Sequence, residues 1–159
     1  MSEIRQFNRS ELSIAIKEAV AAVTDVGMIM HSNTLIGSVA INGQGRDIDV
    51  LVYAIHPNGM VADQVVLDQD WFKGGSAEGA TDETWASWKK DIGGYDVNLI
   101  LTTSNDTATN FLLSTLICKY FQDRFGPLDR AARVAAHRII MDHVCTINLA
   151  DHGNERGEM

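Results

Sequence analysis

The clearest pattern in the chain is the alternation of polar and apolar residues over positions 46–53. Asp47 and Asp49 alternate there with Ile48 and Val50. Successive side chains of a strand point to opposite faces, so this segment predicts a strand with both carboxylates on one face and the apolar residues on the other.

Three further segments predict strands. Residues 95–103 form a strongly apolar run, in which Asp96 and Asn98 are two positions apart and would share a face. Residues 28–37 predict a short strand that leads into a Gly-Ser turn. Residues 60–67 have strand character and follow a Pro-Asn-Gly turn, so we expect them to form a hairpin with the preceding strand.

Three segments predict helices. The first follows Ser10, which would serve as its N-cap, and ends near Gly27. The second spans about 104–125 and ends at a Gly-Pro pair. The third opens at Pro127 and reaches about Cys145.

Between the predicted strands, residues 68–94 lack a regular pattern and hold all three tryptophans among several glycines. A loop this long in a small domain is typically functional or mobile. Strands flanked by helices at both ends predict an α+β fold with a small mixed sheet. We expect one domain over residues 1–150 and a flexible polar tail over 151–159.

Composition narrows the classes of function. The net charge of -8 over 159 residues repels phosphate backbones, so strong non-specific binding to nucleic acid is not expected. No run of 18 apolar residues is present, so we expect no membrane span and a cytoplasmic location. Cys118 and Cys145 have no metal-binding or redox spacing, and we expect both to be thiols.

The two carboxylates of the first strand predict a metal site. Like charges held close together repel unless a cation lies between them, and oxygen ligands favour a divalent ion such as magnesium. Asp96 would add a third carboxylate if its strand pairs with that of Asp47 and Asp49, and Asn98 would add a polar group on the same face. The alternative is an exposed strand whose acids only keep it soluble.

The order of these motifs resembles a known superfamily. Gly37 and Ser38 precede the Asp-x-Asp strand, and Asp96 opens a later apolar strand. This order, over roughly residues 30–143, resembles the DNA polymerase beta-like nucleotidyltransferases, particularly their minimal single-domain members and small phage-encoded proteins of this type. Eight residues separate Ser38 from Asp47, slightly fewer than in the family pattern.

The resemblance implies that Gly37 and Ser38 hold the triphosphate of a nucleotide such as ATP. It also implies that Asp47, Asp49 and Asp96 are catalytic and hold two magnesium ions. Two such ions would hold the attacking and leaving oxygens in line. An ordinary tight turn is the alternative for the Gly-Ser pair.

Basic residues supply further candidates for phosphate contact. Lys89 and Lys90 precede the second acidic strand, although a solvated lysine pair is the commoner explanation. Arg133 is the best match to an arginine that similar phage proteins carry in their last helix, where it would contact phosphate or form a structural ion pair. Arg46 is expected to point away from Asp47. The spacing of His137 and the neighbouring histidines matches no zinc motif.

The leading hypothesis is therefore a magnesium-dependent nucleotidyltransferase that moves a nucleoside monophosphate from a nucleoside triphosphate to a hydroxyl or phosphate of an acceptor such as protein or RNA. The alternative is a fold of the same type that binds a nucleotide, or inhibits a host protein, without catalysis. A third possibility is an antitoxin-like enzyme that modifies a partner toxin.

Overall fold

The computed structural model describes residues 3–74, 85–129 and 131–139, and its main feature is a five-stranded mixed sheet. In spatial order its strands are β2 (Ile29–Ile36), β4 (Asp47–Ile55), β7 (Asp96–Thr102), β6 (Trp85–Asp91) and β5 (Phe72–Lys73). Strands β4 and β7 run parallel, and the other neighbours are antiparallel. The parallel pairing brings the first residues of β4 and β7 side by side.

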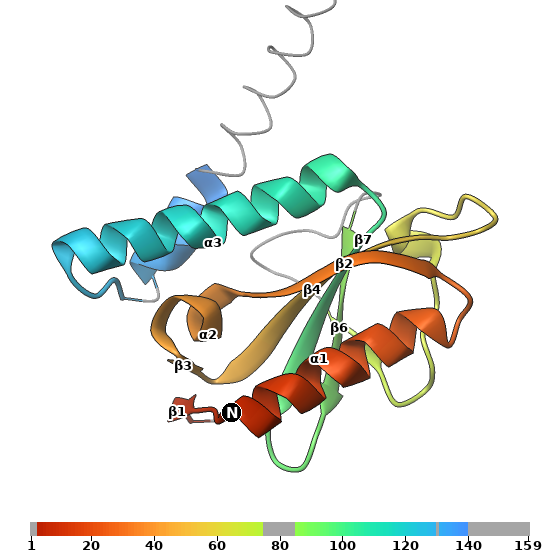
Figure 1. The fold of residues 1–159 in the computed structure, drawn as a ribbon, viewed down its shortest axis with the longest axis horizontal. Coiled ribbons are helices and arrows are strands. Elements are labelled where there is room, and N and C mark those ends of the chain that lie inside the picture. The colour runs from red at the N-terminus through yellow and green to blue at the C-terminus, as the bar shows by residue number, and fades with distance from the viewer. Residues whose placement is uncertain (1–2, 75–84, 130, 140–159) are drawn as a thin grey trace, which may run out of the picture.

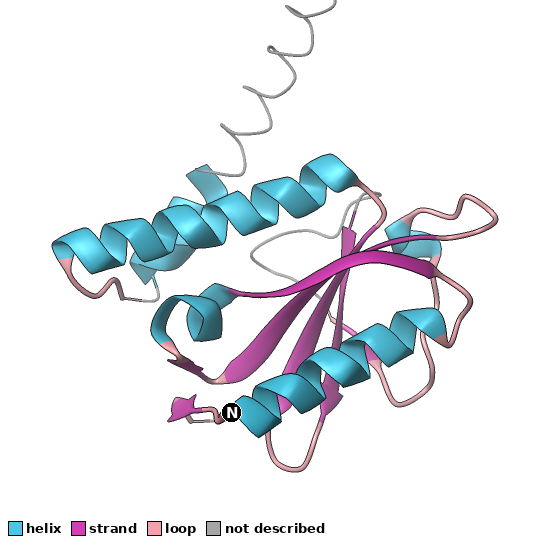
Figure 2. Ribbon diagram, in the orientation of Figure 1, coloured by secondary structure: helices cyan, strands magenta, loops and turns pink. Residues whose placement is uncertain are grey.

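Helices lie on both sides of this sheet (Figures 1 and 2). They are α1 (Arg9–Thr24), the short α2 (Gly37–Asn42), the 3-10 helix η1 (Ala62–Gln64) and α3 (Asn105–Phe125), and residues 131–139 are also helical. A small second sheet joins β1 (Arg5–Gln6) to β3 (Gln44–Gly45). The predicted α+β fold, with a small mixed sheet flanked by helices, is confirmed.

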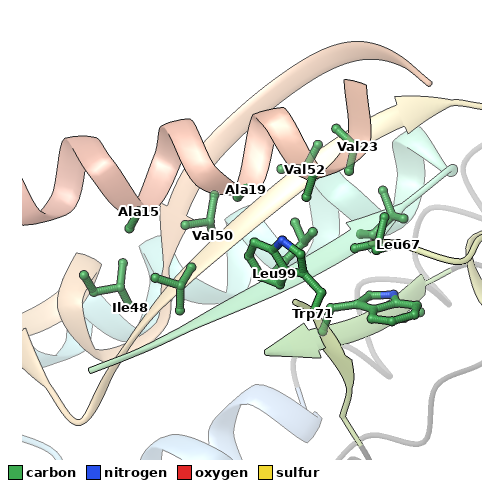
Figure 3. Close-up of a cluster of buried hydrophobic side chains, with 14 of the residues drawn as sticks. Ala15, Ala19, Val23, Ile48, Val50, Val52, Leu67, Trp71 and Leu99 are labelled. Carbon is green, nitrogen blue, oxygen red and sulfur yellow. The ribbon is translucent and has the colours of Figure 1, made fainter. Parts of the chain in front are cut away.

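The larger hydrophobic core lies between α1 and one face of the sheet (Figure 3). Small residues recur on α1 at helical spacing, and branched residues alternate along β4, so each element presents one apolar surface to the other. The residues that meet here are Ala15, Ala19 and Val23 of α1 and Ile48, Val50 and Val52 of β4, together with Leu67, Trp71 and Leu99. This packing fixes β4 with its odd-numbered residues, including both acids, on the opposite face.

The first helix begins slightly earlier than the sequence predicts. Asn8, rather than Ser10, is the N-cap of α1: its side chain accepts a hydrogen bond from the Glu11 N–H at 2.8 Å. The Glu11 carboxylate in turn accepts from the Asn8 N–H at 3.0 Å, which completes a capping box. The reciprocal pair satisfies two donors at the helix start, whereas Ser10 lies inside the helix.

The second face of the sheet is only partly covered. Ser104 caps α3 by accepting from the Thr107 N–H at 3.2 Å, and the helix ends at Gly126, as predicted. Phe111 of α3 packs with Leu51 of β4 in a smaller core. Leu51 lies two residues after Asp49, on the same face of β4, so α3 covers the part of this face that follows the two acids.

Two predictions for the middle of the chain are wrong. Residues 60–67 form no strand and no hairpin; η1 lies within them, and Ala62, Val65 and Leu67 are buried. Within residues 68–94, predicted as a loop, Trp85–Asp91 forms strand β6, and Phe72–Lys73 forms the edge strand β5. Residues 75–84 of that predicted loop lie outside the described part.

The last helix also starts later than predicted. Pro127 is not helical; Asp129 caps the helix at 131–139 by accepting from the Ala132 N–H at 2.7 Å. Because the Asp129 side chain supplies this cap, the helix starts where the acid allows it and not at the proline. The predicted helix end near Cys145 and the tail over 151–159 lie outside the described residues.

Candidate functional site

The acids predicted from the two strands meet at the start of β4 and β7. Their parallel register places Asp47 beside Asp96 and Asp49 beside Asn98. All four residues are half-buried and lie on the face that α3 leaves partly open. Alternation predicted that Asp47 shares a face with Asp49 and that Asp96 shares a face with Asn98, and the parallel register brings the two pairs side by side.

Asn98 joins the two carboxylates of β4. Its Nδ2 donates to Asp47 Oδ2 at 2.8 Å and to Asp49 Oδ1 at 2.9 Å. The two acids are thus separated by a single amide nitrogen, whose two protons offset part of their mutual repulsion. A half-turn of the amide would place the Asn98 oxygen between them instead, so the same side chain can either donate to the two carboxylates or offer an oxygen to a cation.

Gly37 lies directly against Asp49. A Cβ on Gly37 would overlap Asp49 Oδ2 and lie 3.3 Å from its Cγ, and the residue has φ of +71°, which disfavours any other side chain. The Gly37 N–H donates to Thr115 Oγ1 of α3 at 3.4 Å. Glycine is therefore required here by the close approach of the carboxylate as well as by the backbone conformation.

The Gly-Ser pair forms the first residues of helix α2 rather than a simple tight turn. Ser38 Oγ accepts a hydrogen bond from Arg133 Nη1, so the last helix contacts the Gly-Ser segment. The Nε of Arg133 is buried and has no hydrogen-bond partner among the described residues. An unsatisfied buried donor is energetically unfavourable, and it marks this guanidinium as ready to bind an acceptor.

Of the two candidate lysines, Lys89 lies at the site and Lys90 does not. Lys89 is next to Asn98 across β6 and β7, and its Nζ lies 3.9 Å from Asp96 Oδ2. Lys90 points to the other face, where it donates to Glu18 of α1 at 2.9 Å. That hydrogen bond raises the pKa of Lys90. The structure therefore does not bring Lys90 together with the other predicted phosphate-binding residues, and Lys90 does not line their cleft.

Arg46 lies in the wall of the same cleft as Asp47 and Asp49 and is exposed. It immediately precedes β4, which begins at Asp47. That its side chain points away from Asp47 stays a prediction.

The polar residues open onto one large cleft of about 1150 Å³ between the sheet, α2, α3 and the segment 127–137. Its polar and charged lining residues include Ser38, Arg46, Asp47, Asp49, Lys89, Asp96, Asn98 and Arg133, with Gly37 beside them. Its lining also includes Trp85, Ile100, Phe111, Ser114, Cys118 and His137. The cleft therefore combines charged groups with aromatic and apolar groups.

The lining of the cleft also contains His137, which the sequence did not single out as functional. His137 Nδ1 lies 2.6 Å from Ser114 Oγ, and its ring lies 5.5 Å from that of Phe111. Burial lowers the pKa of His137, so the ring is neutral at pH 7. Burial raises the pKa of the neighbouring Cys118 thiol, which therefore stays protonated. The only hint in the sequence is the spacing of one helical turn between Arg133 and His137.

The carboxylates of the site have different partners. Asp47 and Asp49 share the amide of Asn98, and Asp96 Oδ2 lies 3.9 Å from Lys89 Nζ. Within 3–74, 85–129 and 131–139, no group of three or more His, Cys, Asp or Glu side chains is arranged to hold a metal ion. Two carboxylates and an amide remain as oxygen donors of the kind that magnesium prefers.

Comparisons with protein-family models and with curated proteins identify no relative of this chain. No protein-family model matches the sequence, and no curated protein matches it at a significant level. Within the described part of the chain, no helix has both the length and the apolar content needed to span a bilayer. The site must therefore be interpreted from its own geometry.

Proposed function

We propose that the chain is a magnesium-dependent nucleotidyltransferase of the DNA polymerase beta-like type. It would transfer a nucleoside monophosphate from a nucleoside triphosphate to a hydroxyl or phosphate acceptor and release pyrophosphate. The observation that carries this proposal is the position of Asp49, which lies against Gly37 on one side and is linked to Asp47 through Asn98 on the other. A carboxylate pair thus adjoins the Gly-Ser segment inside one cleft.

The donor set fits a divalent cation. The carboxylate oxygens of Asp47 and Asp49 lie on either side of the Asn98 amide nitrogen. If this amide rotates by half a turn, the Asn98 oxygen takes the place of the nitrogen between them. Asp96 would join them by leaving Lys89, and an exposed ion pair at 3.9 Å contributes only about 0 to 1 kcal/mol. When bound, the ions would neutralise the triphosphate and activate the acceptor oxygen.

The residues around the acids have separate roles in this proposal. Arg133, which donates to Ser38 in the chain without ligand, would bind a phosphate oxygen of the nucleotide. Gly37 lets the carboxylate of Asp49 and the backbone of α2 lie close together. Lys89, released from Asp96, would supply a point charge at the opposite wall.

The direct test is transfer of labelled nucleotide. The protein is incubated with magnesium, a cell lysate and each of four α-labelled nucleoside triphosphates, and labelled products are identified by mass spectrometry. We expect transfer by the wild type and a loss of at least about 100-fold in Asp49→Asn, because one charged ligand is removed. Asparagine keeps the size of the side chain against Gly37, so the fold should remain.

Asp91→Asn is the matched control. Asp91 lies beside Asp96 on the next strand, is exposed, and does not line the cleft. The same change of charge is thus made close to the site without touching it, and transfer should stay at the wild-type level. Equal activity of Asp49→Asn and Asp91→Asn would reject the assignment.

A second candidate function is nucleotide binding without catalysis. The observation that favours it is that the described residues hold no group of three metal ligands, while Asp96 Oδ2 lies 3.9 Å from Lys89 Nζ. In that case magnesium nucleotide binds, Asp49→Asn weakens binding, and no lysate supports transfer. Calorimetry beside the transfer assay separates the two functions on the wild type: binding together with transfer indicates a catalytic site, and binding without transfer in any lysate indicates a binding module.

A further inference from the structure

The helix at 131–139 is the least buried wall of the cleft. None of its described residues is fully buried, although Arg133, Val134 and His137 line the cleft. By contrast, α3 buries Phe111 and Ser114 almost completely. Local opening requires least free energy where few apolar contacts are lost, so this helix should open before the other walls.

Two side-chain contacts join this helix to the elements across the cleft, in addition to the interactions of Arg138 and Ile139. Arg133 donates to Ser38 of α2, and His137 lies 2.6 Å from Ser114 of α3. The two residues are one helical turn apart and so project from one face of the helix. One face of the helix at 131–139 thus contacts both α2 and α3 through the neutral hydroxyl groups of Ser38 and Ser114.

The connection to α3 can serve as a hinge. The C-cap residue Gly126 has φ of +101° and ψ of 173°, and a Cβ there would meet nothing within 4 Å. Residues 126–129 are not helical, and Asp129 gives the next helix its own cap. A capped helix behind a short irregular segment can move as a unit, because only a few backbone angles need to change.

Arg133 can bind a phosphate more strongly than it binds Ser38. Its contact with Ser38 is with a neutral acceptor, and its Nε remains buried without a partner among the described residues. A phosphate offers charged oxygens in a geometry that a guanidinium binds through two donors at once. A phosphorylated ligand would therefore hold the helix more firmly than Ser38 does.

We propose that helix 131–139 is a lid, which opens at Gly126 to admit an anionic ligand and closes when Arg133 moves from Ser38 to a phosphate of that ligand. The identity of the ligand as a nucleoside triphosphate rests on the proposed function. The hinge and the two contacts do not, because they are properties of the ligand-free chain.

Hydrogen exchange of the full chain without ligand tests the lid itself. Backbone amides of 131–139 should exchange faster than those at the centre of α3 in the wild type. Ser114→Ala removes one attachment and should speed their exchange about fivefold, as expected for loss of one hydrogen bond, without changing α1. Ser10→Ala, at an exposed position of α1, is the control, and Ser38→Ala tests the second attachment if Ser114→Ala does not fold.

The same measurement with magnesium ATP tests closure. Exchange of 131–139 should slow in the wild type, and less so in Arg133→Gln. Exchange as slow as that of α3, and unchanged in Ser114→Ala and Ser38→Ala, would show that the helix is a fixed wall and overturn the lid. Binding of ATP without slower exchange would overturn closure by phosphate. ATP is replaced by GTP, CTP or UTP if it does not bind. If none of the four binds with magnesium, while exchange without ligand behaves as expected, the lid stands and the proposed function fails.

Discussion

Gly37→Ala is the substitution whose effect follows most directly from the geometry of the site. A Cβ at this position would overlap Asp49 Oδ2, and φ of +71° disfavours alanine in any case. The backbone conformation costs about 1 to 2 kcal/mol, less about 0.4 to 1 kcal/mol because alanine also restricts the unfolded chain. Displacing the Asp49 carboxylate from Asn98 adds about 1.5 to 3 kcal/mol, since a hydrogen bond to a charged group is lost.

Gly59→Ala separates these two effects. Gly59 has nearly the same φ, +73°, but a Cβ there would meet nothing within 4 Å. We expect Gly59→Ala to lower the free energy of unfolding by about 1 kcal/mol or less, and Gly37→Ala by about 2 to 4 kcal/mol. For a chain of this size the difference corresponds to about 4 to 8 °C in Tm.

Urea and thermal unfolding, followed by circular dichroism, measure the difference. A double variant gives the sharpest check, because Asp49→Ala removes the carboxylate that Gly37→Ala would displace. In that background Gly37→Ala should be no more destabilising than Gly59→Ala. Equal effects of the two glycine substitutions in the wild-type background would refute the close contact between Gly37 and Asp49.

Three further outcomes follow from the contacts of the site. Asn98→Leu removes the donor between two carboxylates, so it should destabilise the fold by about 2 to 4 kcal/mol in urea, and added magnesium should restore part of the loss. Folding lowers the pKa of His137, so between that lowered pKa and the ordinary value of 6.5 the unfolded chain binds more protons than the folded chain. Stability should therefore fall as the pH drops from 6.5 toward the folded-state pKa. His137→Gln should flatten this slope in thermal melts at several pH values. Lys89→Met should weaken the binding of a magnesium nucleotide in calorimetry, whereas Lys90→Met should leave it unchanged and lower stability by at most about 1 kcal/mol.

The strand that holds the two acids could be predicted because its alternation is regular. Ile48 and Val50 are fully buried, so a slip of one residue would expose them and bury both carboxylates. The same reasoning predicted that Asp96 and Asn98 share a face. Which strands are neighbours could not be derived from alternation, because pairing depends on contacts between distant parts of the chain.

Strand β6 was missed because its two faces are similarly polar. Trp85, Ser87 and Lys89 alternate with Ala86, Trp88 and Lys90, so neither set stands out as apolar. Lys90 can face the α1 side only because Glu18 meets it there. This pairing also explains why two adjacent lysines were both assigned to the site, although a strand can direct only one of them toward it.

The predicted strand at 60–67 failed for the opposite reason. Its apolar residues suggested a strand, and Val65 and Leu67 are buried on either side of the exposed Val66, but this segment pairs with no strand of the sheet. The contacts of Arg133 with Ser38 and of His137 with Ser114 span 95 and 23 residues. A local sequence pattern cannot indicate such contacts. The role of Arg133 in the last helix could therefore be predicted only from the resemblance to similar phage proteins.

Titration calorimetry of the wild type with ATP, GTP, CTP and UTP, each with and without magnesium, tests the central claim most directly. The account predicts saturable binding of at least one nucleotide that requires magnesium, is lost in Asp49→Asn, and is retained in Asp91→Asn. Absence of binding by all four nucleotides, or binding that is indifferent to magnesium and to Asp49→Asn, would contradict it.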